Sequence, residues 1–195
     1  TAASHGRVFI VEIMGHKVGW LALYAGVAGG ADIILLPEIP YDIRAVVDAI
    51  RARVRSGKNF TILAVAEGAI SKEDAALTKK ELKEKRKNSP SYPSVAYALG
   101  AQIGEMTGQE IRVTVPGHMQ RGGEPRPYDR VIATRLGAEA GELIRRKEYG
   151  YMVALNHGGI TKVPLEEIAG KLKTVDPQSD IIREARAVGI SFGDE

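Results

Sequence analysis

Short apolar runs recur along the first part of the chain, and Gly or Pro closes each of them within two residues. They cover residues 8–13, 33–36, 61–66 and 111–115. Continuous apolar runs of this length predict strands that are covered on both faces. Segments of helical length, 20–28, 43–54 and 95–106, lie between them. Because strand–helix–strand repeats form right-handed crossovers, the pattern predicts an α/β fold, a Rossmann-like parallel sheet with helices on both faces.

A polar segment over 71–97 interrupts this alternation and predicts an inserted helix and loop. The later elements are a long helix, two short strands and an amphipathic helical tail, over 126–146, 151–163 and 165–189. We therefore expect an α/β domain over 1–125 and a second group, a helix with closing strands and helices, over 126–195.

The composition narrows the class of protein. A chain of 195 residues with 44% hydrophobic residues can bury an ordinary core. It has no cysteine, which excludes disulfides, thiolate catalysis and Cys-type zinc sites. No apolar run reaches the roughly 18 residues of a membrane span. We therefore expect no membrane partner and a cytoplasmic location. Lysines over 72–87 alternate with acidic residues, and Tyr92 and Tyr97 lie beyond them, so we expect no nucleic-acid partner.

Polar residues follow the predicted strands, where α/β sheets bind their ligands. Met14, Gly15 and His16 follow the first strand, and Glu67 follows the third. The Glu67 carboxylate suits either a helix start or sugar hydroxyls. Arginines flank the first and fourth strands near their starts, at positions 7 and 112.

The fourth strand runs into Gly-His-Met-Gln-Arg-Gly-Gly over 117–123, which places His118 and Arg121 beside a glycine pair. An arginine fork and backbone amides freed by glycine suit a phosphate ester. A turn that needs its glycines for positive φ, with Arg121 on the surface, explains the same spacing equally well. No second histidine or carboxylate stands at ligand spacing from His5 or His157, so we expect no metal site in the chain.

Two segments carry a family resemblance: Arg-Val-Phe-Ile-Val-Glu-Ile-Met-Gly over 7–15, and Gly-His-Met-Gln-Arg-Gly-Gly through Tyr-Asp-Arg over 117–130. In order and separation they resemble the 6-phosphofructokinase family. The resemblance extends through residues 25–32, 37–38, 66–68 and 133–137, and so covers the chain from Arg7 to about Leu143.

The resemblance implies a glycolytic transferase, a kinase that moves a phosphoryl group from ATP or pyrophosphate to the 1-hydroxyl of fructose 6-phosphate. This chain would supply the fructose 6-phosphate site. Arg112, His118 and Arg121 match family positions that hold the 6-phosphate. Arg7 matches a residue that reaches the sugar phosphate from a neighbouring subunit, which implies a homo-oligomer, a tetramer or dimer. The positions that line and hydrogen-bond the sugar are matched by Met14, Gly15 and Glu67.

The family's glycine-rich donor loop and its Thr-Ile-Asp segment, whose aspartate is the general base, precede the stretch that this chain matches. We therefore expect the general base and Mg²⁺ to belong to a preceding portion with the phosphoryl donor. Residues 126–195 would belong partly to that donor-binding domain. The chain alone is expected to be inactive, because neither base nor donor cradle is encoded. The alternative is a non-catalytic sugar-phosphate-binding or regulatory module.

Two positions depart from the family pattern. His16 stands where the family has an arginine near the reacting centre. Glu38 matches the glutamate of the bacterial effector site, but the accompanying basic and histidine positions read Ser56, Lys58 and Phe60. We therefore do not expect effector control of that type.

Overall fold

The computed structural model describes residues 6–88 and 90–195, which form two compact units. The first comprises the chain up to Gln120 together with Thr174–Glu195, and the second comprises Arg121–Lys173. The boundary near 120 lies close to the predicted one at 125. The tail, however, which was grouped with the second part, packs in the first unit because its apolar residues complete a core there.

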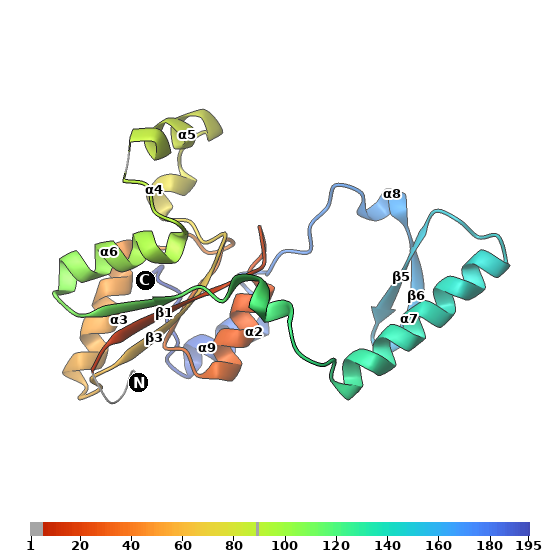
Figure 1. The fold of residues 1–195 in the computed structure, drawn as a ribbon, viewed down its shortest axis with the longest axis horizontal. Coiled ribbons are helices and arrows are strands. Elements are labelled where there is room, and N and C mark those ends of the chain that lie inside the picture. Colours follow the sequence, from red (N-terminus) through yellow and green to blue (C-terminus); the bar gives the residue numbers. More distant parts are fainter. Residues whose placement is uncertain (1–5, 89) are drawn as a thin grey trace. The chain divides into compact units, whose positions relative to one another are not determined.

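The first unit contains a four-stranded parallel sheet, which confirms the predicted α/β class (Figure 1). Its strands are β1 (Val8–Ile13), β2 (Ile33–Leu35), β3 (Thr61–Ala66) and β4 (Ile111–Thr114), in the order β2-β3-β1-β4. β1 pairs with both β3 and β4, so it lies inside the sheet. Because all four strands are parallel, their carboxyl ends share one edge.

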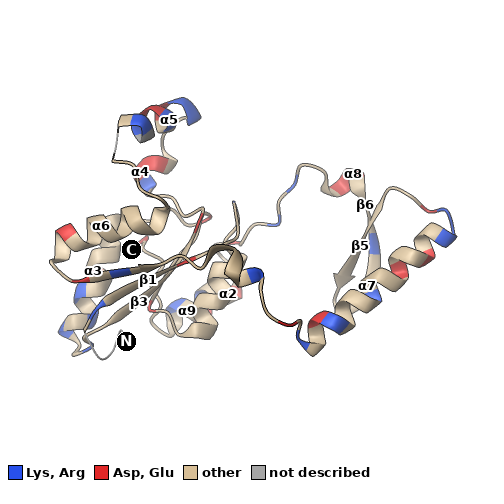
Figure 2. Ribbon diagram, viewed as in Figure 1, with Lys and Arg blue, Asp and Glu red and all other residues tan. Residues whose placement is uncertain are grey.

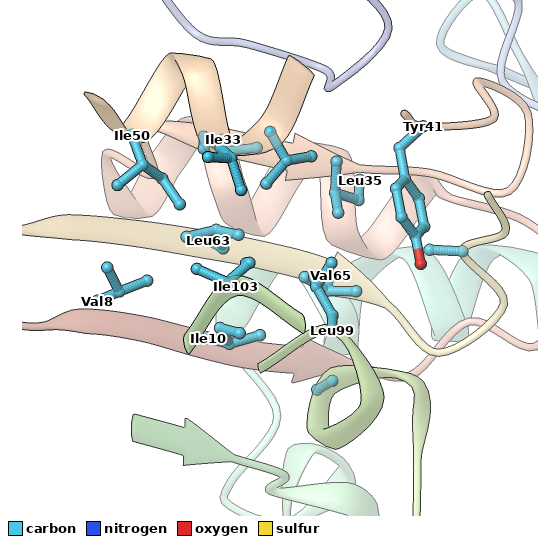
Figure 3. Close-up of a cluster of buried hydrophobic side chains, with 14 residues drawn as sticks. Val8, Ile10, Ile33, Leu35, Tyr41, Ile50, Leu63, Val65, Leu99 and Ile103 are labelled. Carbon is cyan, nitrogen blue, oxygen red and sulfur yellow. The ribbon is translucent and has the colours of Figure 1, made fainter. Parts of the chain in front are cut away.

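Helices cover both faces of this sheet. α3 (Ile43–Arg55) and α6 (Val95–Thr107) pack on one face, where their apolar residues meet Val8, Ile10 and Leu63 in the cluster of Figure 3. α2 (Trp20–Gly29) and α9 (Asp180–Ala187) pack on the other, with Phe192 fully buried among them. Buried aliphatic and aromatic side chains of this size dominate the stability of a domain of this kind.

The predicted insertion consists of two short helices, α4 (Lys72–Ala75) and α5 (Lys79–Asn88). Figure 2 shows basic and acidic residues mixed on α5. Lys85 of α5 donates to the Asp74 carboxylate at 2.5 Å, and this hydrogen bond raises the pKa of Lys85. The insertion is thus a charged surface element.

The second unit consists of α7 (Pro127–Arg145), the antiparallel pair β5 (Tyr151–Asn156) and β6 (Gly159–Pro164), and α8 (Leu165–Ile168). These elements agree with the predicted long helix and two strands. Leu143 is the only buried hydrophobic side chain among the described residues of this unit. None of the described helices of either unit is long and apolar enough to cross a bilayer.

Candidate functional site

The loop between β1 and α2 is held by Glu67, the residue that follows β3. One carboxylate oxygen of Glu67, Oε1, accepts the backbone N–H groups of Gly15 at 3.2 Å and His16 at 2.6 Å. The Glu67 N–H in turn donates to the Ile13 carbonyl at 2.9 Å. The parallel pairing of β1 with β3 places Ile13 opposite Ala66, which is why the two strand ends meet. The sequence-predicted residues Gly15, His16 and Glu67 are therefore in direct contact.

Close backbone approach fixes the shape of this loop. A Cβ on Gly68 would lie 2.2 Å from the His16 carbonyl oxygen, and one on Gly15 would lie 2.6 Å from the Val18 carbonyl oxygen. Real Cβ atoms essentially never come within 3.0 Å of another atom, so both positions require glycine. His16 itself has a φ of 56°, an uncommon left-handed conformation for a residue with a side chain. Its imidazole is exposed.

The 3₁₀ helix η1 (Gly117–Arg121) carries the predicted phosphate motif, and one of its residues contacts the loop. The Gln120 side-chain oxygen accepts the Met14 N–H at 3.3 Å. His118 and Arg121 are exposed, and Arg121 begins the second unit. Through Gln120, the segment that follows β4 is thus hydrogen-bonded to the Met14–His16 loop.

Glu38, which follows β2, serves as an anchor for backbone groups. Its two carboxylate oxygens accept the Gly19 N–H at 3.0 and 3.1 Å, and Oε1 also accepts the Val175 N–H at 3.0 Å. Gly19 directly precedes α2, so the carboxylate caps that helix and complements its dipole. Glu38 therefore ties the start of α2 to the C-terminal tail of the first unit.

Arg7 and Arg112 lie together at the opposite end of the sheet. Arg7 precedes β1, and Arg112 pairs with Phe9 near the start of β4. Glu110 connects them, since its Oε2 accepts Arg7 Nε at 2.5 Å and its Oε1 forms an ion pair with Arg112 Nη2. Arg112 also lines a cavity of about 410 Å³ between α6 and β4.

The predicted site residues of the first unit therefore form two groups. Six strand residues at about 3.3 Å each separate the Arg7 end of β1 from the Met14 end by about 20 Å. A hexose monophosphate is shorter than this span. One such molecule cannot contact Glu67 and Arg7 of the same chain.

Two residues of the site received no role in the sequence analysis. Gln120 lies within the Gly-His-Met-Gln-Arg-Gly-Gly motif over 117–123, but only its contact with the Met14 N–H shows what its side chain does. Glu110 precedes β4 as an ordinary surface glutamate, and its place between two arginines depends on the pairing of β1 with β4. No local pattern in the sequence signals either contact.

Metal ligands were not expected in this chain. In the part of the chain that the structure describes, no group of three or more His, Asp or Glu residues could hold a metal ion.

The four-stranded parallel sheet with helices packed on both faces defines a doubly wound α/β protein. The sequence matches the Phosphofructokinase family over residues 1–144, and the chain belongs to this family. It is 54% identical to the ATP-dependent 6-phosphofructokinase of Spirochaeta thermophila and 46% identical to that of Chloroflexus aurantiacus. Both alignments cover 100% of this chain, and 53% and 52% of those relatives.

Solved structures agree with this assignment. Pichia pastoris phosphofructokinase in the T-state matches with a TM-score of 0.65 at 35% identity, over 85% of this chain and 18% of that one. A pyrophosphate-dependent phosphofructokinase from Nitrosospira multiformis matches with a TM-score of 0.74 over 97% of this chain and 50% of that one. The latter is 20% identical and supports the fold alone. The chain spans about half the length of the curated relatives it matches.

Proposed function

We propose that this chain supplies the fructose 6-phosphate site of a 6-phosphofructokinase, which transfers a phosphoryl group to the sugar's 1-hydroxyl. The observation that carries the proposal is the preorganised loop at the carboxyl edge, where Glu67 holds the backbone of Gly15 and His16. A loop that is already held in place loses little conformational entropy when the substrate binds, which favours binding.

Glu67 has the chemistry to hold a sugar hydroxyl. Its Oε1 is occupied by the loop amides, whereas Oε2 has no hydrogen-bond partner among the described residues. A free carboxylate oxygen accepts a hydroxyl proton in a charge-assisted hydrogen bond, which is stronger than a neutral one. In the proposal, Met14 and Gly15 line the sugar while His118 and Arg121 bind its 6-phosphate.

We propose ATP as the donor. The relatives that cover the whole chain at 46–54% identity carry ATP-dependent names, whereas the pyrophosphate-dependent neighbours are 20–22% identical. Mg²⁺ accompanying the donor stays a prediction, and because the described residues hold no metal cluster, no role of this chain is assigned through it. The general base is likewise proposed to lie outside this chain.

We further propose that each sugar site is shared by two copies of the chain. Arg7 and Arg112 lie about 20 Å along β1 from the loop that Glu67 holds, so the pair would serve the site of a second copy. Arg112 would then act with Arg7, across the interface, rather than beside His118 of its own chain. A C2 dimer with two equivalent shared sites is the simplest such assembly.

The sugar role of Glu67 is tested by Glu67→Gln in the complete protein, with Glu105→Gln on the exposed surface of α6 as the matched control. Losing a charge-assisted hydrogen bond should raise the KM for fructose 6-phosphate about 10- to 100-fold in Glu67→Gln. Glu105→Gln should leave it unchanged. Equal KM values for both variants would refute the assignment. Sugar-phosphate binding without phosphoryl transfer from ATP or pyrophosphate would favour the non-catalytic module.

Shared sites predict complementation between two variants that each bind the sugar weakly, when activity is assayed at fructose 6-phosphate far below the KM of either variant. Mixing Arg112→Ala chains with Glu67→Gln chains creates hybrid dimers in which one site receives Arg112 from one chain and Glu67 from the other. Random reassociation should then recover about a quarter of wild-type activity. Sites contained within one chain would recover none. Size-exclusion chromatography of the mixture checks that subunits have exchanged.

A further inference from the structure

The arginine pair at the amino end of the sheet already holds an anion, the carboxylate of Glu110. Each carboxylate oxygen engages one arginine, Oε2 with Arg7 and Oε1 with Arg112. In the described part of the chain, the other guanidinium nitrogens of both arginines make no hydrogen bond. The carboxylate thus bridges two cations that otherwise repel each other.

The backbone keeps all three residues in place. The Glu110 carbonyl accepts the Val8 N–H at 3.2 Å, and β1 and β4 pair from Val8 and Ile111 onward. Glu110 and Arg7 are therefore fixed on adjacent segments of the same chain, where β4 and β1 begin. Only side-chain rotation can release the carboxylate, and its 46% exposed surface leaves room for that movement.

A phosphate ester and the Glu110 carboxylate compete for the same donors. Arginine binds both with its planar fork, and a phosphate that approaches the pair also meets the carboxylate's negative charge. The trio has a net charge of +1, whereas the arginines alone have +2. The carboxylate therefore weakens the attraction of the pair for a second anion.

We propose that Glu110 is an internal competitor for the phosphate group, which occupies the Arg7–Arg112 pair in the free protein and sets its affinity for the sugar phosphate. This inference rests on the proposed function, in which the arginine pair binds the 6-phosphate. Glu110 is a specificity-determining residue in this role: only an anion that outcompetes one carboxylate gains both guanidinium groups.

The chain offers a matched control. Glu142 of α7 also lies against two arginines, Arg145 at 2.7 Å and Arg146 at 3.7 Å. Its side chain is 44% exposed, close to the 46% of Glu110. Glu142→Gln therefore removes the same charge from a similar environment, at a position with no part in the proposed site.

The test measures binding of fructose 6-phosphate to the complete protein by calorimetry, at low and at high ionic strength, with inorganic phosphate as a competitor. A full charge about 6 Å from a phosphate dianion changes affinity about tenfold in water. Glu110→Gln should therefore lower the Kd about three- to tenfold at low ionic strength. The gain should shrink at high ionic strength, because salt screens exposed charges. Inorganic phosphate should compete more effectively in this variant, and Glu142→Gln should match the wild type.

Arg7→Ala and Arg112→Ala separate failure of this inference from failure of the proposed function. If both weaken binding while Glu110→Gln binds as the wild type does or more weakly, the competitor role is overturned and the phosphate role of the arginines stands. If the arginine variants bind like the wild type, the phosphate role fails, and the competitor role fails with it. A salt-independent gain in Glu110→Gln would also overturn it, since a packing change rather than charge would then be responsible.

Discussion

Replacing Gly68 by alanine would place a methyl group 2.2 Å from the carbonyl oxygen of His16. An ordinary van der Waals contact begins at about 3.4 Å, so one of the two backbone segments must move by about 1 Å. The obstacle is backbone rather than the flexible end of a side chain, and the Pro37 ring, 3.2 Å away, limits retreat in another direction. The strain should cost about 1–3 kcal/mol of folding free energy, as overpacking usually does.

The same movement displaces the loop that Glu67 holds. A shift of about 1 Å at a positioning element lowers kcat/KM by up to about 100-fold. The assay is steady-state phosphoryl transfer by the complete protein at varied fructose 6-phosphate, with thermal unfolding measured on the same preparation. A loss of 1–3 kcal/mol should lower the Tm of a domain of about 150–250 residues by about 2–12 °C.

Gly137→Ala is the control, because Gly137 lies within α7 and a Cβ there meets nothing within 4 Å. That substitution should stabilise the protein by about 0.5–1 kcal/mol and leave kinetics unchanged. A Gly68→Ala protein with wild-type kcat/KM and wild-type Tm would refute the claim that this close approach sets the shape of the loop.

Three further substitutions test the contacts around the sheet. Glu12→Ala removes the buried carboxylate that accepts the Ala96 N–H at the start of α6, and urea unfolding should show a loss of about 1–2 kcal/mol. Glu38→Ala leaves the tail unanchored, so hydrogen exchange of the Val175 amide should accelerate while amides in the core keep their protection. Burial, with smaller help from nearby carboxylates, raises the pKa of Tyr41 from 10.0 to about 12. The neutral phenol therefore contributes stability below pH 10, and about 2–3 kcal/mol should be lost as the pH rises to about 12. Tyr41→Phe should abolish that part of the alkaline loss, and an unchanged pH dependence would contradict it.

The sequence alone was sufficient for the fold class. Apolar runs closed by Gly or Pro predicted all four strands to within one residue. Burial on both faces explains the continuous apolar runs of β2 and β3, whereas the edge strand β4 is not covered on both faces and alternates between half-buried and exposed residues. The Met14–His16 loop and Glu67 were also predictable as neighbours. Both follow parallel strands, and parallel strands present their carboxyl ends at one edge.

Tertiary structure decided the contacts between segments that are distant in the sequence. The tail over 174–195 joins the first unit because Val175, Ile182 and Phe192 fill a core beside α2, and amphipathicity shows that a helix buries one face without showing against what. The bridging position of Glu110 exists only once β4 has paired with β1. The same pairing of β4 with β1 places Arg112 near Arg7, whereas the distance from Arg7 to the Met14–His16 loop follows from the length of β1, which the sequence predicted. Local patterns determine which residues form strands and helices, whereas the partner of each side chain depends on which strands become neighbours.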